Sequence, residues 1–516
     1  MRRLLLSLLF LAGFVVASAA DFAARFDDLV RTASPRQLYA LLYDLPKGGD
    51  LHNHSGGSDR PEWMFEIMTD PARNGGDTFY TRVRVTPPAS ADTAPSVRFR
   101  LIRQRTYDRL TPAARADYVA LKDLTPAERT EWGNSFRLDE PGEGRDEFFN
   151  AIWARRGEMG QNLDVRLELL VANIKAFAAE GLAYLETQFG ADGAVTNDGR
   201  AITPEDAVTR IERRLAQPDV VATGLVVRFQ DTVLRFHPEA EKRLAETYAF
   251  VASHRDRWVG VNLAGLESDP RGHPRRFLET FRQLRARFPT LALSIHAGEM
   301  DGPDSHIRDT LLLGASRIGH GLNLIHDADT LLLLQQTRRV LVEINLISNR
   351  LLGYTPDLTQ HPFPEYLRTG VPVCLNTDDR GMWDSNLTDE YYTAVTTFHL
   401  SWPEVVQLGR HSLAHAFVQP AVKAKLLADY ETRIAAFESR YGTGTASDAL
   451  VKLETVKPVT YGYARRAWGM EFKQEHSKVR KAFDALTLQT TSRSLPLTLT
   501  SQTYPTERWP VPFRDS

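Results

Sequence analysis

The most constraining feature of this 516-residue sequence is an alternation that begins near Asp164. Amphipathic stretches of helical period alternate there with short apolar runs rich in Val, Leu and Ile, a pattern typical of repeated βα units. We therefore predict an α/β fold, a closed parallel (β/α)8 barrel of the TIM type. The expected strands are Gly48–Leu51, Leu182–Thr187, Val220–Val227, Val259–Leu263, Leu291–Ile295, Arg317–Ile318, Val340–Ile344 and Val373–Asn376.

Other stretches flank or interrupt this barrel, which we expect over residues 46–420. We expect residues 21–45 to form a helical segment that packs against the barrel. We expect residues 421–516 to form a helical extension with a tail, from Pro496, that is extended or disordered. Residues 56–160 are too long for a simple connection after the first strand. This insertion is expected to cap the barrel mouth, to contact a partner, or to form a loose surface loop.

The first twenty residues resemble a targeting segment. Arg2 and Arg3 precede an apolar run from Leu4 to Val16, and the small residues Ala17-Ser18-Ala19 follow. This order is typical of a cleaved signal peptide, and the run is shorter than the ~20 residues that cross a bilayer. We expect an exported protein, periplasmic or secreted, with no membrane attachment after cleavage.

Charge and cysteine content exclude several classes of site. The formal net charge is -2, which does not favour a nucleic-acid partner. Cys374 is the only cysteine, so an intramolecular disulfide and Cys-rich zinc sites are both excluded. Any zinc must be held by histidine and carboxylate side chains.

A candidate metal site begins at the first expected strand, which ends in His52 and His54. Residues at i and i+2 of an extended chain point to the same face, so two imidazoles could bind one ion. His296 and Asp378 follow two later apolar strands, and His320 ends a third. Because the carboxyl ends of barrel strands converge on one mouth, these groups can share a site suited to metal-assisted hydrolysis.

The strings that carry these residues resemble the adenosine deaminase family over about residues 46–420. The leader and the long insertion are most similar to its larger extracellular, growth-factor-related branch and the bacterial counterparts. The matching strings are Pro46 to His54, Val259 to Gly265, His296-Ala-Gly-Glu299, Arg317 to Gly321 and Leu375 to Asp379.

The resemblance implies a zinc-dependent hydrolase that converts adenosine, and also 2'-deoxyadenosine, to inosine and ammonia. It implies one zinc ion per chain. The zinc ligands that it implies are His52, His54, His296 and Asp378.

The resemblance also implies catalytic roles. Asp378 would contact the attacking water, His320 would orient and assist it, and Glu299 would donate a proton to N1 of the purine. Asp379 would bond the N7 side of the base. The backbone of Gly265 would approach N3, because the absence of a Cβ permits close contact.

One position departs from the family pattern. Compact family members carry an acidic sugar contact two residues after the His-x-His pair, and here that position is Gly56. Asp59 or Glu62 could supply a replacement, and the sequence does not choose between them.

Several alternatives remain open at this point. The same zinc site could deaminate adenine or another aminopurine, or the barrel could be a non-catalytic exported signalling or binding protein. A phosphotriesterase-like hydrolase is disfavoured because Val259–Gly265 contains no bridging lysine. The expected partner is a small purine nucleoside, and a homodimer is compatible with the sequence.

Overall fold

The computed structural model describes residues 22–85 and 97–472. The expected leader over residues 1–20 and the tail from Pro496 lie outside these ranges. No helix within the described ranges is both long enough and apolar enough to cross a bilayer.

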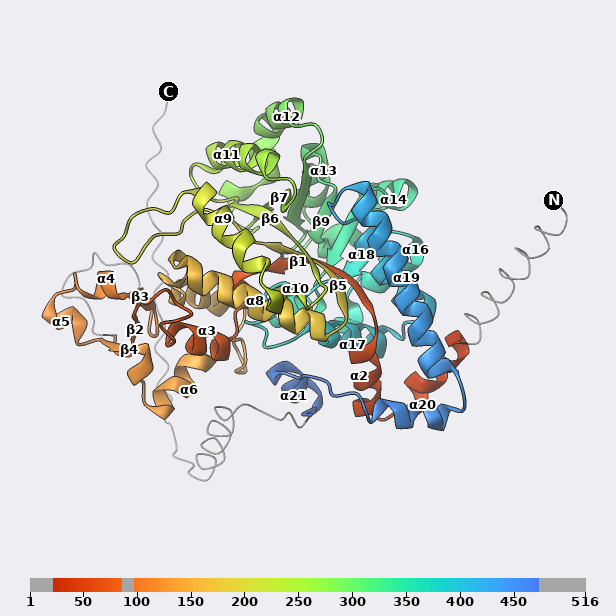
Figure 1. Ribbon diagram of the computed structural model, residues 1–516. Coiled ribbons are helices and arrows are strands. Elements are labelled where there is room, and N and C mark those ends of the chain that lie inside the picture. The colour runs from red at the N-terminus through yellow and green to blue at the C-terminus, as the bar shows by residue number, and fades with distance from the viewer. Residues whose placement is uncertain (1–21, 86–96, 473–516) are drawn as a thin grey trace. The chain divides into compact units, whose positions relative to one another are not determined.

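Eight parallel strands form one sheet in the order β1-β5-β6-β7-β8-β9-β10-β11, which follows the order of the sequence (Figure 1). The residues after β11 return to β1, where Asn53 pairs with Asp378 in a parallel bridge. The sheet is therefore nearly closed, and the predicted TIM-type barrel is confirmed. The strands are β1 Lys47–His54, β5 Leu182–Gln188, β6 Val226–Leu234, β7 Trp258–Ala264, β8 Ala292–Ala297, β9 Arg317–His320, β10 Leu341–Ile344 and β11 Val373–Leu375.

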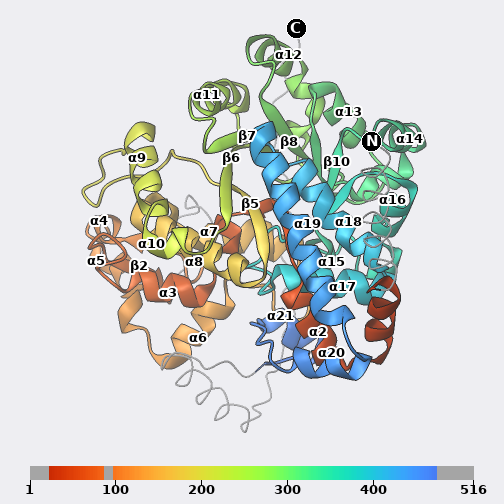
Figure 2. The same cartoon turned by 45° about the vertical axis from the view of Figure 1, so that its right-hand side comes forward.

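Helices surround the strands, as the two views in Figures 1 and 2 show. The longer ones between consecutive strands are α8 Leu163–Ala179, α9 Pro204–Leu215, α11 Ala240–Ser253, α12 Leu278–Arg287, α13 His306–Leu313, α14 Ala328–Thr337, α15 Leu346–Leu351 and α16 Phe363–Thr369. After β11 come α17 Leu387–Phe398, α18 Trp402–Ala414, α19 Pro420–Gly442, α20 Ala446–Leu453 and α21 Gly462–Trp468. Residues 22–32 are helical, and α2 Pro35–Asp44 is capped at its N-terminus by Ser34, which forms a capping box with Gln37.

One predicted strand is wrong over most of its length. Val220 and Val221 belong to the short helix α10 Pro218–Val221, and the strand begins only at Val226. Pro218 occupies the first turn of this helix, where its missing N–H costs nothing. Gly224 then turns the chain with a φ of 67° before β6 begins. Proline and glycine therefore outweighed the strand preference of the β-branched residues Val220 and Val221.

The insertion after β1 folds around a core of its own. Its strands β2 Phe79–Arg82, β3 Leu101–Arg103 and β4 Tyr118–Ala120 form an antiparallel sheet in the order β3-β2-β4. Its helices are α3 Pro61–Met68, α4 Gln104–Tyr107, α5 Pro112–Arg115, α6 Pro126–Asn134 and α7 Trp153–Arg155. A buried apolar cluster that includes Met64, Phe79 and Trp132 joins the sheet to these helices. The described insertion is thus folded, not a loose loop.

The last part of the insertion lies against the barrel loops. Leu138 donates its backbone N–H to the carbonyl of Met382 at 2.9 Å, and Arg145 pairs with Asp301 at 2.5 Å. Phe148, in a π-helical turn, packs against Trp383 with ring centroids 4.9 Å apart. These contacts place the insertion beside the loops that follow β8 and β11.

Candidate metal centre and active site

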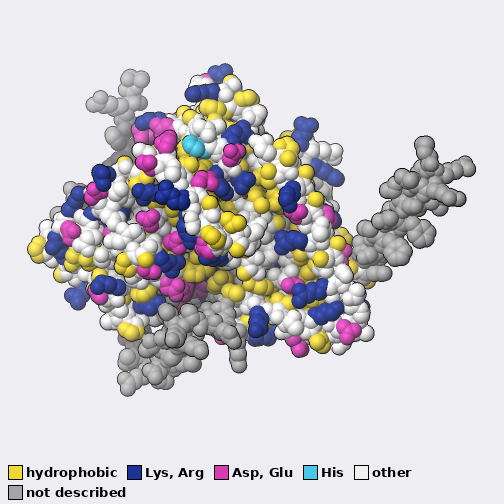
Figure 3. Space-filling view, viewed as in Figure 1, with side chains coloured by type: hydrophobic (Ala, Val, Ile, Leu, Met, Phe, Trp, Pro, Cys, Tyr) yellow, Lys and Arg dark blue, Asp and Glu magenta, His cyan; other side chains and the backbone are white. Residues whose placement is uncertain are grey.

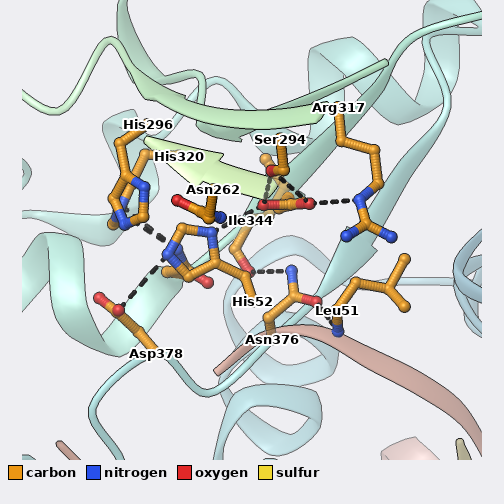
Figure 4. A network of polar contacts seen from close by, with 12 residues as sticks. Leu51, His52, Asn262, Ser294, His296, Arg317, His320, Ile344, Asn376 and Asp378 are labelled. Atoms are coloured by element: carbon orange, nitrogen blue, oxygen red, sulfur yellow. Dashed lines mark hydrogen bonds and ion pairs between the residues drawn. The ribbon is translucent and has the colours of Figure 1, made fainter. Parts of the chain in front are cut away.

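Four histidines and an aspartate meet at the carboxyl ends of the barrel strands. His52 and His54 end β1, His296 lies near the end of β8, and His320 ends β9. Asp378 follows β11 and pairs back to β1. Figure 4 shows the side chains of His52, His296, His320 and Asp378 in one group.

The donor atoms in this group are close together. Nε2 of His54 lies 3.1 Å from Oδ1 of Asp378, and Nε2 of His52 lies 3.5 Å from the same oxygen. Nε2 of His296 is 3.2 Å from Nε2 of His54. Donor atoms of His52, His54 and His296 all lie within 4.8 Å of one another, as do those of His52, His320 and Asp378.

The group fits a metal ion better than it fits a set of ordinary hydrogen bonds. Nε2 of His52 is buried and has no hydrogen-bond partner among the described residues. Such an atom costs free energy unless a ligand satisfies it. Three imidazoles with one carboxylate match the donors of catalytic zinc. The structure therefore contains a His/Asp metal site typical of zinc amidohydrolases.

The backbone at this site is unusual. Asp378 and His320 have φ angles of 52° and 64°, in the left-handed region that residues other than glycine rarely adopt. Such conformations persist only where the surrounding structure holds them, and they concentrate at functional sites.

A buried ion network lies behind His52, deep inside the barrel (Figure 4). Nδ1 of His52 lies 2.8 Å from Glu343, whose other oxygen is 2.6 Å from Arg317. Arg317 also pairs with Glu186, and Ser294 donates to Glu343. Burial alone raises the pKa of Glu343, but Arg317 and His52 hold that pKa below its usual value. The carboxylate thus accepts the Nδ1 proton, which leaves Nε2 of His52 free to bind a metal.

Sequence reasoning missed Glu343 and the role of the Arg317 side chain. Glu343 interrupts the otherwise apolar run of β10, and it is fully buried. A charged residue in the middle of an apolar strand was the signal that could have identified it, because such residues are almost never fully buried unless paired.

Glu299 lies just beyond β8, buried beside His320, with Oε2 3.6 Å from Nε2 of that histidine. Burial, with the nearby charge of Asp378, raises the pKa of Glu299 well above its usual value. A raised pKa favours the acid form of the carboxyl, which is the form that can donate a hydrogen bond or a proton.

His320 is held as a neutral imidazole. Burial lowers its pKa to about 3, although Asp378 opposes the shift. The amide nitrogens of Asn345 and Asn349 lie 3.2 and 3.3 Å from its Nδ1. Since these amides donate to Nδ1, the ring proton is on Nε2, the nitrogen that faces Glu299.

Two further predicted contacts lie on the same rim. Asp379 is buried, and its side chain lies against the backbone of Gly57. A Cβ on Gly57 would lie 1.5 Å from Oδ1 of Asp379, so only glycine fits at position 57. Burial and the charge of Asp378 raise the pKa of Asp379 well above its usual value. Gly265 follows β7 with a φ of 103°, and a Cβ would lie 2.7 Å from Phe236, so this position requires glycine.

Arg156 of the insertion contacts Gly56, the position at which compact family members carry an acidic residue that contacts the sugar. Arg156 donates to the carbonyl of Gly56 and, at 2.7 Å, to Asp59. Burial raises the pKa of Asp59 to about 6, although Arg156 opposes the shift. Glu62, the other candidate, pairs with Arg137. Of the two acidic residues, Asp59 is the one held next to Gly56.

The family model described as adenosine deaminase matches residues 124–432. An adenosine deaminase from Enterococcus faecalis is 32% identical over 255 residues, which are 49% of this chain and 72% of the relative. An adenine deaminase from Paraburkholderia phytofirmans is 30% identical over 266 residues, 51% of this chain and 72% of the relative. A solved amidohydrolase from Burkholderia ambifaria, with bound Zn, shares the fold with a TM-score of 0.57 and 17% identity, over 81% of this chain and 95% of that chain.

Proposed function

The chain belongs to the adenosine deaminase family of hydrolases, and from this premise we propose that it deaminates adenosine, and also 2'-deoxyadenosine, to inosine and ammonia. The observation that carries the proposal is the buried carboxyl of Glu299, whose Oε2 lies 3.6 Å from Nε2 of His320, beside a His/Asp metal site. A hydrolysis that must protonate a ring nitrogen needs such an acid next to the attacking water.

We propose one zinc ion per chain, held by His52, His54, His296 and Asp378. The donor set supports this choice, because zinc accepts nitrogen and carboxylate ligands whereas magnesium prefers oxygen. Zinc bound at this position would supply Lewis-acid chemistry and would lower the pKa of the attacking water to about 7.

The remaining steps belong to the side chains of the protein. Glu299 gives its proton to N1 of the purine, which removes the aromatic character of the ring and makes C6 electrophilic. As the water adds to C6, one of its protons passes through the carboxylate of Asp378 to the amino group. The C6–N bond then breaks and releases ammonia, while the second proton of the water returns to Glu299 and leaves the C6 carbonyl of inosine. Neutral His320 donates from Nε2 and orients the attacking oxygen. Asp379, buried next to Asp378, bonds the N7 side of the base, and the backbone of Gly265 approaches N3. These groups fix the base so that binding is strongest as the tetrahedral carbon forms.

The alternative substrate is free adenine or another aminopurine. Two observations favour it: a relative named adenine deaminase is 30% identical, and Gly56 offers no side chain to a sugar. An absorbance and ammonia assay against adenosine, 2'-deoxyadenosine, adenine and AMP separates these outcomes. Adenosine should have the highest kcat/KM. A preference for adenine would replace the proposal, and the absence of turnover with every purine would favour a non-catalytic binding protein.

We also propose that the protein is exported and belongs to the growth-factor-related branch. The residues that support this are Arg2, Arg3 and the apolar run behind them, together with the long insertion between β1 and β5. On the face in Figure 3, basic and acidic side chains are interspersed without a broad basic patch. Cell fractionation with N-terminal sequencing is the test: the protein should leave the cytoplasm and begin after residue 19 or 20.

A further inference from the structure

The C-terminal segment, residues 459–470, packs against the turn that carries Asp379. This segment contains α21, and it lies beyond residue 432, where the family match ends. Tyr463 donates its backbone N–H to the carbonyl of Asp384 at 2.8 Å. Asn386 donates to the carbonyl of Val459 at 2.9 Å. Residues 379–386, the site turn, are therefore bonded at their far end to a part of the chain that is not in the barrel.

Asp384 is the centre of these contacts. Its φ is 53°, a conformation that its surroundings must maintain. Three guanidinium groups lie around its carboxylate: Arg60 at 3.2 Å, Arg137 at 3.6 Å and Arg466 at 3.4 Å. Arg60 and Arg137 come from the insertion, whereas Arg466 comes from α21. The carboxylate thus joins the insertion, the site turn and the C-terminal segment.

The C-terminal segment and the site turn are packed so closely that a side chain larger than glycine does not fit between them. A Cβ on Gly462 would lie 1.9 Å from Oδ2 of Asp384. At the other end of the turn, a Cβ on Gly381 would lie 2.6 Å from the carbonyl carbon of Ser58, and Gly57 touches Asp379 directly. A shift of Gly462 is therefore passed along the turn toward Asp379, because close-packed interiors transmit strain.

Apolar contacts support the same arrangement. Tyr463 belongs to a buried cluster with Met382 and Trp383 of the site turn. The cluster also contains Leu138 and Phe148 of the insertion. Figures 1 and 2 both show α21 below the barrel, near α2. The side of the active site that carries Asp379 is thus held by a segment that the barrel itself does not provide.

We propose that the C-terminal segment is a positioning element for the purine, with Gly462 and Arg466 as its positioning residues. They keep the site turn in place, so that Asp379 has one orientation toward the base. The inference rests on the proposed function in one respect: it takes Asp379 as a contact of the purine ring. Asp378, the zinc ligand that precedes Asp379, is held by β1 instead: its backbone N–H donates to the carbonyl of His52 at 2.9 Å, and its carbonyl accepts from the N–H of His54 at 3.1 Å.

The test uses the full-length, zinc-loaded protein and three variants. Arg466→Ala removes the contact with Asp384. Arg465→Ala is the matched control, because Arg465 is the adjacent residue of α21 and is exposed like Arg466, whereas the ion pair with Asp384 is made by Arg466. Gly462→Ala places a methyl group against Asp384. In Arg466→Ala and Gly462→Ala the KM for adenosine should rise about tenfold or more, with kcat changed less than about threefold and zinc content unchanged, because a small misplacement weakens binding of the base. Arg465→Ala should match the unmodified protein.

Equal kinetics in Arg466→Ala and Arg465→Ala would overturn the inference, as would a fall in kcat and zinc content together. A folded Arg466→Lys variant, which keeps the charge, should recover most of the loss. If the unmodified protein deaminates no purine, the proposed function fails and the positioning claim is judged by hydrogen exchange. Residues 379–386 should then exchange faster in Arg466→Ala and Gly462→Ala but not in Arg465→Ala, and unchanged exchange in the first two variants would contradict the claim.

Discussion

Replacing Glu343 by glutamine tests the buried network behind the metal site. Glu343 is fully buried and contacts three side chains: Nδ1 of His52 at 2.8 Å, Arg317 at 2.6 Å and Ser294 at 3.0 Å. Glutamine keeps the size of the side chain but loses the negative charge, and its amide nitrogen is a donor that would face Arg317 or His52, which are themselves donors.

The expected loss has two parts. Removing one partner of a buried ion pair costs about 3–5 kcal/mol, and we expect the lower end because Arg317 keeps its pair with Glu186. Zinc affinity should fall by about 10–100-fold, since the group that orients a metal-binding histidine is lost. The first quantity is measured by urea unfolding of the metal-free protein, and the second by competition with a chelator of known affinity.

Glu186→Gln is the matched control. Glu186 is equally buried and pairs with the same Arg317, but it accepts its other side-chain hydrogen bonds from Tyr184 and Gln230, which are not metal ligands. It should lower the free energy of unfolding by a similar amount and change zinc affinity less than about threefold. If the two variants weaken zinc binding equally, or if neither does, the network supports the fold without orienting His52.

Two further predictions concern the catalytic groups, and a third concerns recognition of the sugar. Glu299→Gln should lower turnover by roughly 100-fold or more with zinc still bound, because the amide cannot donate the proton that N1 requires; a variant that loses zinc but keeps its rate per zinc would make Glu299 structural. His320→Asn should likewise lower kcat more than zinc content, measured on the same preparation. The kcat/KM for 5'-deoxyadenosine should be within about tenfold of that for adenosine, since a neutral sugar hydrogen bond is worth only about 0.5–1.5 kcal/mol and Gly56 provides no side chain; a loss beyond roughly a hundredfold would instead indicate that Asp59, held by Arg156, contacts the sugar.

The barrel was predictable because its strands are buried on both faces and read as short apolar runs between helices. Strand ends that converge on one mouth also allowed His52, His296 and Asp378 to be grouped from positions far apart in the sequence. The predicted third barrel strand was wrong because polar residues and a proline outweighed the pattern of apolar residues. β6 contains Arg228, Gln230 and Asp231, so its apolar signal was weak, and Pro218 began a helix where a strand was expected.

The rest of the site depended on contacts that no local pattern encodes. Arg317 pairs with Glu186 and Glu343 inside the barrel. The apolar pattern of the strands predicts a hydrophobic interior there, so it gives no sign of these ion pairs. Arg466 reaches Asp384, 82 residues away, from a helix that follows the barrel. Such long-range polar pairs follow from the closed topology, and they become visible only when the strands and loops are placed in space.

We propose that deamination requires one zinc ion per chain at the His/Asp site. The most direct measurement is a titration of zinc into the metal-free protein, with ammonia release from adenosine followed at each addition. Activity should rise linearly and reach its plateau at about one equivalent per chain, as expected for a single set of three histidines and one carboxylate. Full activity without metal, or a plateau that requires two equivalents, would contradict the account.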